Sequence, residues 1–183
     1  MVLDTIVEGC KHQERVAQKL LYNRYVGTLY RLSLRYVRIV SDAEDCTSEA
    51  FVKIFDKIQS FDYKESNSFE TWIKRIVINQ SLMCLRKRGS FVITEIDEAF
   101  EVQTVSNFED NIDAKQILKL ILDLPDGYRT VFNLYAIEGY RHSEIAKMLN
   151  ISENTSKTQL HKARLVLQKK LMSEFGIKNE KTI

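Results

Sequence analysis

A row of basic and polar side chains recurs at helical spacing in the C-terminal part of the chain. The row consists of Asn154, Lys157, Thr158, His161, Lys162 and Arg164. Cationic, hydroxyl and amide side chains of this kind bind phosphate oxygens and the edges of base pairs. The positions between them that share the opposite face are Ser156, Leu160, Ala163 and Leu167. The pattern therefore predicts a helix with one buried face and one face suited to nucleic acid.

A second helix is predicted directly before this one. Its apolar residues, again at helical spacing, are Ile145, Ala146 and Leu149. Asn150 interrupts the run, and Ser152 can cap the next helix. Two helices joined by such a turn form a helix-turn-helix, which places its second helix in the DNA major groove. Arg141 stands where many such motifs have a small capping hydroxyl, so Tyr140 or Ser143 can supply the cap, or the helix begins later.

An acidic amphipathic pattern covers residues 42–55. Ser41 or Asp42 can cap a helix that begins at Ala43, where acids complement the helix dipole. The predicted buried face is Cys46, Ala50, Phe51, Ile54 and Ile58. The outward face carries Asp45, Ser48 and Glu49. From the residues alone, this outward face is either a binding surface or an ordinary solvated one.

A basic and aromatic pattern covers residues 68–88. The predicted inward residues are Trp72, Ile73, Ile76, Val77 and Leu82. The polar face shows Lys74, Arg75 and Asn79 and ends in the basic residues 86–88. Basic side chains interleaved with aromatic ones can bind a nucleic-acid backbone and stack on exposed bases. For Trp72 a place in the core is the favoured interpretation.

The elements that must position these side chains are predicted to be helices. The chain has 183 residues with one Pro and six Gly, and so few breakers favour an all-α fold. Further helices are expected over 14–38, 113–123 and 126–137. We expect two small helical domains, 1–93 and 114–183, joined by an acidic linker, 94–113. No membrane insertion or signal peptide is predicted, which implies a cytoplasmic protein.

Charge divides along the same boundaries. Residues 1–93 carry a net charge of +4, residues 94–113 carry −7 and residues 114–183 carry +5. Basic blocks fit a polyanionic partner, and DNA would repel the strip between them. Solvated helices often differ in charge by this much, so the charge distribution is weaker evidence for a nucleic-acid partner than the motifs are.

Enzymatic and metal-dependent functions lack support in the sequence. No nucleophile–base set, phosphate-binding loop or metal-ligand spacing is visible. The three cysteines, Cys10, Cys46 and Cys84, are widely spaced and contain no CxxC pair. We expect reduced, buried or half-buried thiols, no cofactor and no catalytic residue. His142 and His161 are expected to lie at the surface or to face DNA.

The three patterns, in this order, resemble an RNA polymerase sigma factor of the extracytoplasmic function group, within the sigma-70 family. Residues 42–51 (DAEDCTSEAF) are similar to the family's core-polymerase-binding helix, and residues 68–80 (SFETWIKRIVINQ) to its −10-element helix. Residues 124–164 are similar to its −35-binding domain. The resemblance implies a protein that binds core RNA polymerase, directs it to promoters and opens the duplex.

The resemblance also assigns residues to partners. Asp45, Ser48 and Glu49 match positions that meet the clamp helices of the largest polymerase subunit, and the polymerase flap is a further implied contact. Most members have Leu at the position of Cys46 and Gln at that of Ser48, so this chain departs at both. An anti-sigma factor is an expected partner.

DNA contacts follow in the same way. Positions matching those that face the −10 element are Lys53, Arg75 and Asn79, while Ser66, Asn67 and Ser68 match the loop that captures a flipped base. Extruding a base costs free energy that a polar pocket can offset. The implied −35 base readers are Lys157, Thr158, His161 and Lys162. Asn154 and Arg164 are expected to touch phosphate, which positions the helix without reading sequence.

A stand-alone helix-turn-helix regulator is the alternative. Such a protein would bind DNA without polymerase and would have a dimer face, and no heptad seam is visible in the sequence. For the sigma factor, the resemblance implies a linker that runs through polymerase channels built for nucleic acid. We expect the seven acids of 94–113 to act there as a nucleic-acid mimic.

Overall fold

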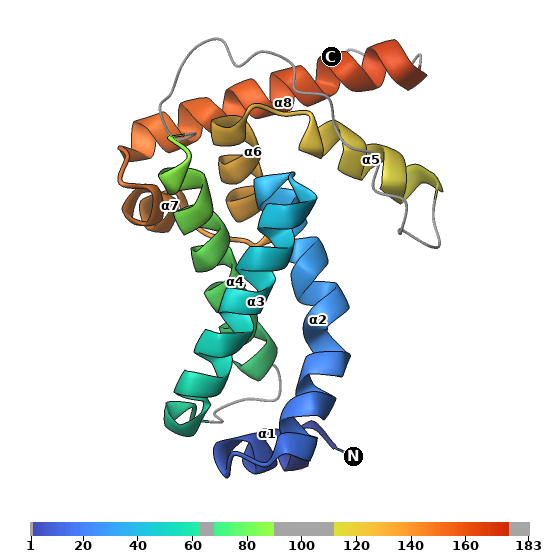
Figure 1. Cartoon of the computed structure of the whole chain (residues 1–183). Helices are drawn as coiled ribbons and strands as arrows, with labels where there is room; N and C mark the ends of the chain where they lie inside the picture. The colour runs from blue at the N-terminus through green and yellow to red at the C-terminus, as the bar shows by residue number, and fades with distance from the viewer. Residues whose placement is uncertain (1, 63–67, 90–111, 176–183) are drawn as a thin grey trace. The chain divides into compact units, whose positions relative to one another are not determined.

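The computed structural model describes residues 2–62, 68–89 and 112–175, and within these ranges the chain forms helices and turns with no strand (Figure 1). The expected all-α fold is therefore confirmed. The chain divides into two compact units, Met1–Arg88 and Gly89–Ile183. Most of the acidic linker expected over 94–113 lies outside the described residues, as do Ser66 and Asn67.

The first unit is a bundle of three long helices with a short one at its end. The helices are α1 (Leu3–Lys11), α2 (Arg15–Val37), α3 (Val40–Lys57) and α4 (Ser68–Lys87). Helices α2, α3 and α4 pack against one another, and α1 packs against α2 and the 3-10 turn Ile58–Ser60 (Figure 1). All five residues expected on the buried face of the acidic amphipathic pattern are buried, four of them in α3 and Ile58 in the 3-10 turn that follows it. Apolar burial on this scale is the main force that holds such a bundle together.

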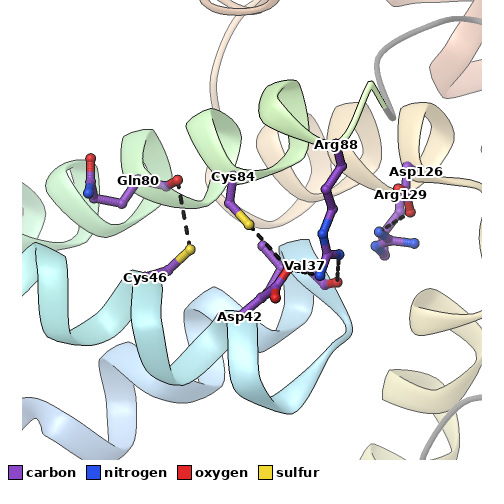
Figure 2. A network of polar contacts seen from close by, with 8 residues as sticks. All are labelled: Val37, Asp42, Cys46, Gln80, Cys84, Arg88, Asp126 and Arg129. Atoms are coloured by element: carbon purple, nitrogen blue, oxygen red, sulfur yellow. Dashed lines mark hydrogen bonds and ion pairs between the residues drawn. The ribbon is translucent and has the colours of Figure 1, made fainter.

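The start of α3 differs from the sequence prediction. The helix begins at Val40, and its N-cap is Ile39 with no side-chain cap bond, so neither Ser41 nor Asp42 caps it. The physical reason is a tertiary contact. The Asp42 carboxylate forms an ion pair with Arg88 and accepts a hydrogen bond from the Cys84 thiol at 3.2 Å (Figure 2). Arg88 also donates to the Val37 carbonyl at 3.4 Å, which ties α4 to the end of α2.

The second unit contains the predicted helix-turn-helix. Its helices are α5 (Ile112–Leu122), α6 (Asp126–Phe132), α7 (His142–Leu149) and α8 (Glu153–Phe175), and α8 packs against the other three. The expected stripe of α8 faces inward, with Ser156, Leu160 and Ala163 buried and Leu167 half-buried. Arg129 is fully buried, and its guanidinium pairs with Asp126 (Figure 2) and donates to the Leu124 carbonyl at 2.7 Å.

The helix expected over 126–137 is not uniform. After Phe132 the chain continues as a π-helical turn, Asn133–Ile137, in which the Glu138 amide donates to the Asn133 carbonyl at 2.9 Å. This bond spans five residues rather than four, which widens the last turn. Gly139 then adopts φ +78°, a conformation open to glycine without strain, and the helix ends.

Local caps define the start of α7 and the turn between α7 and α8. Arg141 is the N-cap of α7, and the Glu144 carboxylate accepts its amide at 2.8 Å, so neither Tyr140 nor Ser143 is needed as a cap. Asn150 ends α7 in the left-handed conformation with φ 55°, which Asn tolerates better than most residues. The Ser152 hydroxyl accepts the Thr155 amide at 2.9 Å, which confirms the predicted cap of α8.

Candidate nucleic-acid interface

The outer face of α8 carries the side chains expected to meet the −35 element. Asn154, Lys157, Thr158, His161 and Arg164 are exposed, and Lys162 is half-buried. They lie opposite the buried residues of the same helix, so an approaching surface would meet them first. The Thr158 hydroxyl donates to the Asn154 carbonyl at 2.9 Å, which leaves its oxygen lone pairs free to accept from a base.

A stack of side chains links the π-helical turn to both helices of the motif. The ring of Tyr135 stacks on His142, with centroids 4.5 Å apart, and the Arg164 guanidinium lies 5.9 Å from the Tyr135 centroid. Nδ1 of His142 hydrogen-bonds the Ser156 hydroxyl at 2.9 Å. Burial and the nearby Lys157 charge lower the pKa of His142, so the imidazole is held neutral. His142 is thus half-buried, and it contacts both the π-helical turn and α8.

Helix α4 carries the expected −10 residues. Arg75 and Asn79 are exposed and, being four residues apart, share one face of the helix. Ser68 is the first residue of α4 and is half-buried. The ring of Trp72 lies 4.9 Å from that of Phe61 and 5.7 Å from that of Phe69, centroid to centroid. Trp72 thus contacts two buried rings but is itself half-buried, so the core position that the sequence favoured is only partly realised.

Helix α3 carries the residues expected to meet polymerase. Asp45, Ser48 and Glu49 are all exposed along one side of the helix. The Ser48 hydroxyl donates to the Glu44 carbonyl at 2.9 Å, so it is turned back onto its own helix. The two carboxylates are left as the outward-facing charged groups of this surface.

Gln80 on α4 connects two of these surfaces, and the sequence prediction did not include it. Its Nε2 donates to Glu49 Oε2 at 2.6 Å, and its Oε1 accepts a hydrogen bond from the Lys53 ammonium. Gln80 is 3 % exposed. The available signal was a polar residue three positions after the inward-facing Val77, at a place where the helical period calls for an apolar side chain.

The cysteines are structural in character. Cys46 and Cys10 are buried and Cys84 is half-buried, and all three are free thiols. Burial and contact with Cys46 raise the pKa of Cys84 to about 11, and burial also raises that of Cys46. Among the described residues no group of His, Cys, Asp or Glu has a geometry that could hold a metal ion. No helix in the described ranges is long and apolar enough to cross a membrane.

Family models match both units. Residues 21–91 match the model described as sigma-70 region 2, which spans the acidic and aromatic patterns of α3 and α4. Residues 114–167 match sigma-70 region 4, which spans the helix-turn-helix. Because both models match one chain in this order, the alternative of a stand-alone helix-turn-helix regulator is excluded.

Full-length relatives agree with this division. The chain is 31 % identical to the ECF RNA polymerase sigma factor SigW of Bacillus subtilis over 93 % of its own length and 97 % of the relative's. It is 26 % identical to the ECF RNA polymerase sigma-E factor of Haemophilus influenzae, over 91 % and 93 %. The fold is similar to that of the sigma factor RpoE from Bartonella quintana, solved with the anti-sigma factor NepR (TM-score 0.54, 20 % identity, 85 % of this chain and 97 % of that one). The chain therefore belongs to the extracytoplasmic function group of RNA polymerase sigma factors, within the sigma-70 family.

Proposed function

We propose that this sigma factor divides promoter recognition among three surfaces on named helices. The outer face of α8 reads the −35 element, the polar side of α4 together with Lys53 meets the −10 element, and the acidic side of α3 binds core polymerase. As a sigma factor the chain supplies specificity and has no catalytic activity of its own. The observation that supports the division best is the α8 face, whose basic and polar residues are exposed, apart from the half-buried Lys162, while Ser156 and Ala163 behind them are fully buried.

The −35 contact combines base and phosphate recognition. Lys157, Thr158, His161 and Lys162 read base edges, since their donors and acceptors can reach into the major groove. Asn154 and Arg164 bind phosphates at either end of this row. The stacking of Arg164 on Tyr135 supports the phosphate role, because a guanidinium held against an aromatic ring loses less freedom on binding an anion.

The −10 contact involves the exposed Arg75 and Asn79 and the half-buried Lys53. A base flipped from the non-template strand is taken up by the segment that contains Ser66, Asn67 and Ser68, of which Ser68 alone lies in the described part. Polymerase binding uses Asp45, Ser48 and Glu49 against the clamp helices of the largest subunit, and the flap is contacted from the second unit.

We further propose an anti-sigma factor as a regulatory partner and the cytoplasm as the site of action. The RpoE structure named above contains such a factor, and CnrH, with a similar fold (TM-score 0.53, 19 % identity, 93 % of this chain and 97 % of that one), was solved with the cytosolic domain of CnrY. Polymerase and promoter DNA are met in the same compartment.

Run-off transcription tests the proposal as a whole. Purified core polymerase is combined with the chain and a library of promoter fragments, and transcripts are compared with those from core alone. New transcripts with defined start sites support the proposal. No promoter-specific initiation above the core background would sink it.

A further inference from the structure

Glu49 and Lys53 stand four residues apart on α3, a spacing at which Glu and Lys ordinarily pair with each other across one helical turn. In this structure both residues are described, and they form no ion pair with each other. The Gln80 amide from α4 lies between them instead. Two opposite charges whose sequence spacing would allow them to pair are thus separated by the buried, neutral Gln80 amide.

The direction of the Gln80 amide is fixed by its neighbours. Its Nε2 donates to the Glu49 carboxylate at 2.6 Å, and its Oε1 accepts from the Lys53 ammonium. Rotating the amide by half a turn would place its carbonyl oxygen against the carboxylate and its NH₂ group against the ammonium. Both contacts would then be repulsive, so only one orientation is compatible with both partners.

The Gln80 side chain also has little room to leave this place. It is 3 % exposed, and the thiol of Cys46 contacts the Gln80 backbone carbonyl at 3.8 Å. Figure 2 shows this contact between α3 and α4. The next residue, Ser81, hydrogen-bonds Ser33 of α2 at 3.0 Å inside the core. This turn of α4 is therefore attached to both neighbouring helices.

We propose that Gln80 is a positioning residue that keeps Glu49 available to core polymerase and Lys53 available to −10 DNA. The inference rests on the proposed function of these two residues. Each retains capacity for its partner: Glu49 is exposed and has its second carboxylate oxygen, and the Lys53 ammonium has two further N–H groups. Without the amide the two charges would pair directly, which would neutralise both binding groups at once.

Replacement of Gln80 by Met is the central test, because Met has a similar length and volume and lacks the amide. Two quantities are measured on the full chain. The first is the affinity for core polymerase, from competition with labelled wild-type protein. The second is the fraction of promoter DNA opened at saturating core, from permanganate reactivity of unpaired thymines. Circular dichroism melting confirms that each variant is folded.

We expect Q80M to lower both quantities, with core affinity falling roughly tenfold, the size of one lost charge-assisted hydrogen bond. The informative outcome is rescue. Adding K53M to Q80M removes the lysine that has captured Glu49, so core affinity returns toward wild type while opening stays low. Adding E49Q to Q80M frees Lys53, so opening at saturating core recovers while core affinity stays low.

A purely structural role for Gln80 predicts that neither second change rescues anything. Losses in Q80M without these reciprocal recoveries would therefore overturn the inference, as would wild-type values in Q80M. The single variants E49Q and K53M separate this failure from a failure of the proposed function. If E49Q keeps full core affinity and K53M opens promoters normally, the assigned roles themselves are wrong. Q18M, at a half-buried glutamine of α2, is the matched control and should behave as wild type.

Discussion

Lys157 and Lys162 are two lysines of α8 that differ in their exposure to solvent. Lys157 is exposed on the outer face of α8, and Lys162 is half-buried. We expect K157A to weaken binding to the preferred −35 sequence by about 1–3 kcal/mol if the lysine meets a base. A lysine that meets only phosphate would lower affinity equally for scrambled DNA and reduce the salt dependence. Holoenzyme binding to both DNAs across salt concentrations distinguishes the two, with K169A as a control further along the helix.

Ser48 is the residue at which the polymerase-binding surface departs from the family. Its hydroxyl is bonded to the Glu44 carbonyl at 2.9 Å, whereas the Gln that the family resemblance implies at this position has a longer side chain with an amide at its end. We therefore expect S48Q to raise the affinity for core polymerase by about three- to tenfold, through one added hydrogen bond. S41Q, at another exposed serine of α3, should leave the affinity unchanged. Equal gains in both variants would contradict a specific contact at residue 48.

The thiol of Cys84 is expected to react slowly. Its pKa is raised to about 11 by burial and by the neighbouring Cys46, so at pH 8 only about one molecule in a thousand carries the thiolate that attacks alkylating reagents. Iodoacetamide labelling followed by mass spectrometry should show slow modification in the native protein and rapid modification in urea. Equal rates in the two states would show that the α3–α4 contact around Cys84 is absent in solution.

At the scale of the helix, the beginning of α8 depends on one serine. The Ser152 hydroxyl accepts the Thr155 amide at 2.9 Å, and replacing such a cap by Ala costs about 1 kcal/mol. We expect S152A to lower the opening free energy of the amides in the first turn of α8 by this amount in native-state hydrogen exchange. S173A, near the other end of the same helix, should leave these amides protected as in the wild type.

The packing of α7 on α8 is expected to weaken in mild acid through His142. The folded state depresses the pKa of His142 below its ordinary value of 6.5, so the unfolded chain binds this proton more strongly. The stabilising contribution is complete above pH 6.5 and is lost as the pH falls through that value toward the lower folded pKa. The melting temperature should therefore drop between pH 7.5 and 6.0, and the drop should be smaller in H142Q. An identical pH dependence in both proteins would exclude this role.

At the scale of the whole molecule, the helical period of the apolar residues predicted which faces of the helices are buried. The buried faces of α3 and α8 follow from helical spacing, and the end of α7 at Asn150 and the cap at Ser152 follow from local residue preferences. Contacts between distant residues could not be read in this way. Asp42 does not cap α3 as predicted, because its carboxylate pairs with Arg88, which is 46 positions further along the chain. The π-helical turn after Phe132 could not be recognised from the spacing of the apolar residues.

The residues of the candidate site also fall into two groups, those predictable from a single helix and those that depend on contacts between elements. Residue types and the family resemblance were enough to choose exposed positions on α3, α4 and α8, because an outward face is a property of one helix. The side chains that hold those residues in place come from other elements. Gln80 reaches Glu49 and Lys53 from the neighbouring helix, and Tyr135 reaches Arg164 from a turn. Both contacts depend on tertiary packing, which a single sequence does not reveal.

The central claim is that polymerase and promoter are bound by separate surfaces of one specificity subunit. It is tested most directly by open-complex formation on a transcribed promoter as the concentration of the chain is varied against fixed core polymerase. D45K should raise the half-saturating concentration and reach the wild-type plateau, whereas the double variant K157A/H161A should lower the plateau without changing the affinity for core. Promoter opening or specific DNA binding by D45K that does not depend on polymerase, or equal effects of both variants on core affinity, would contradict the account.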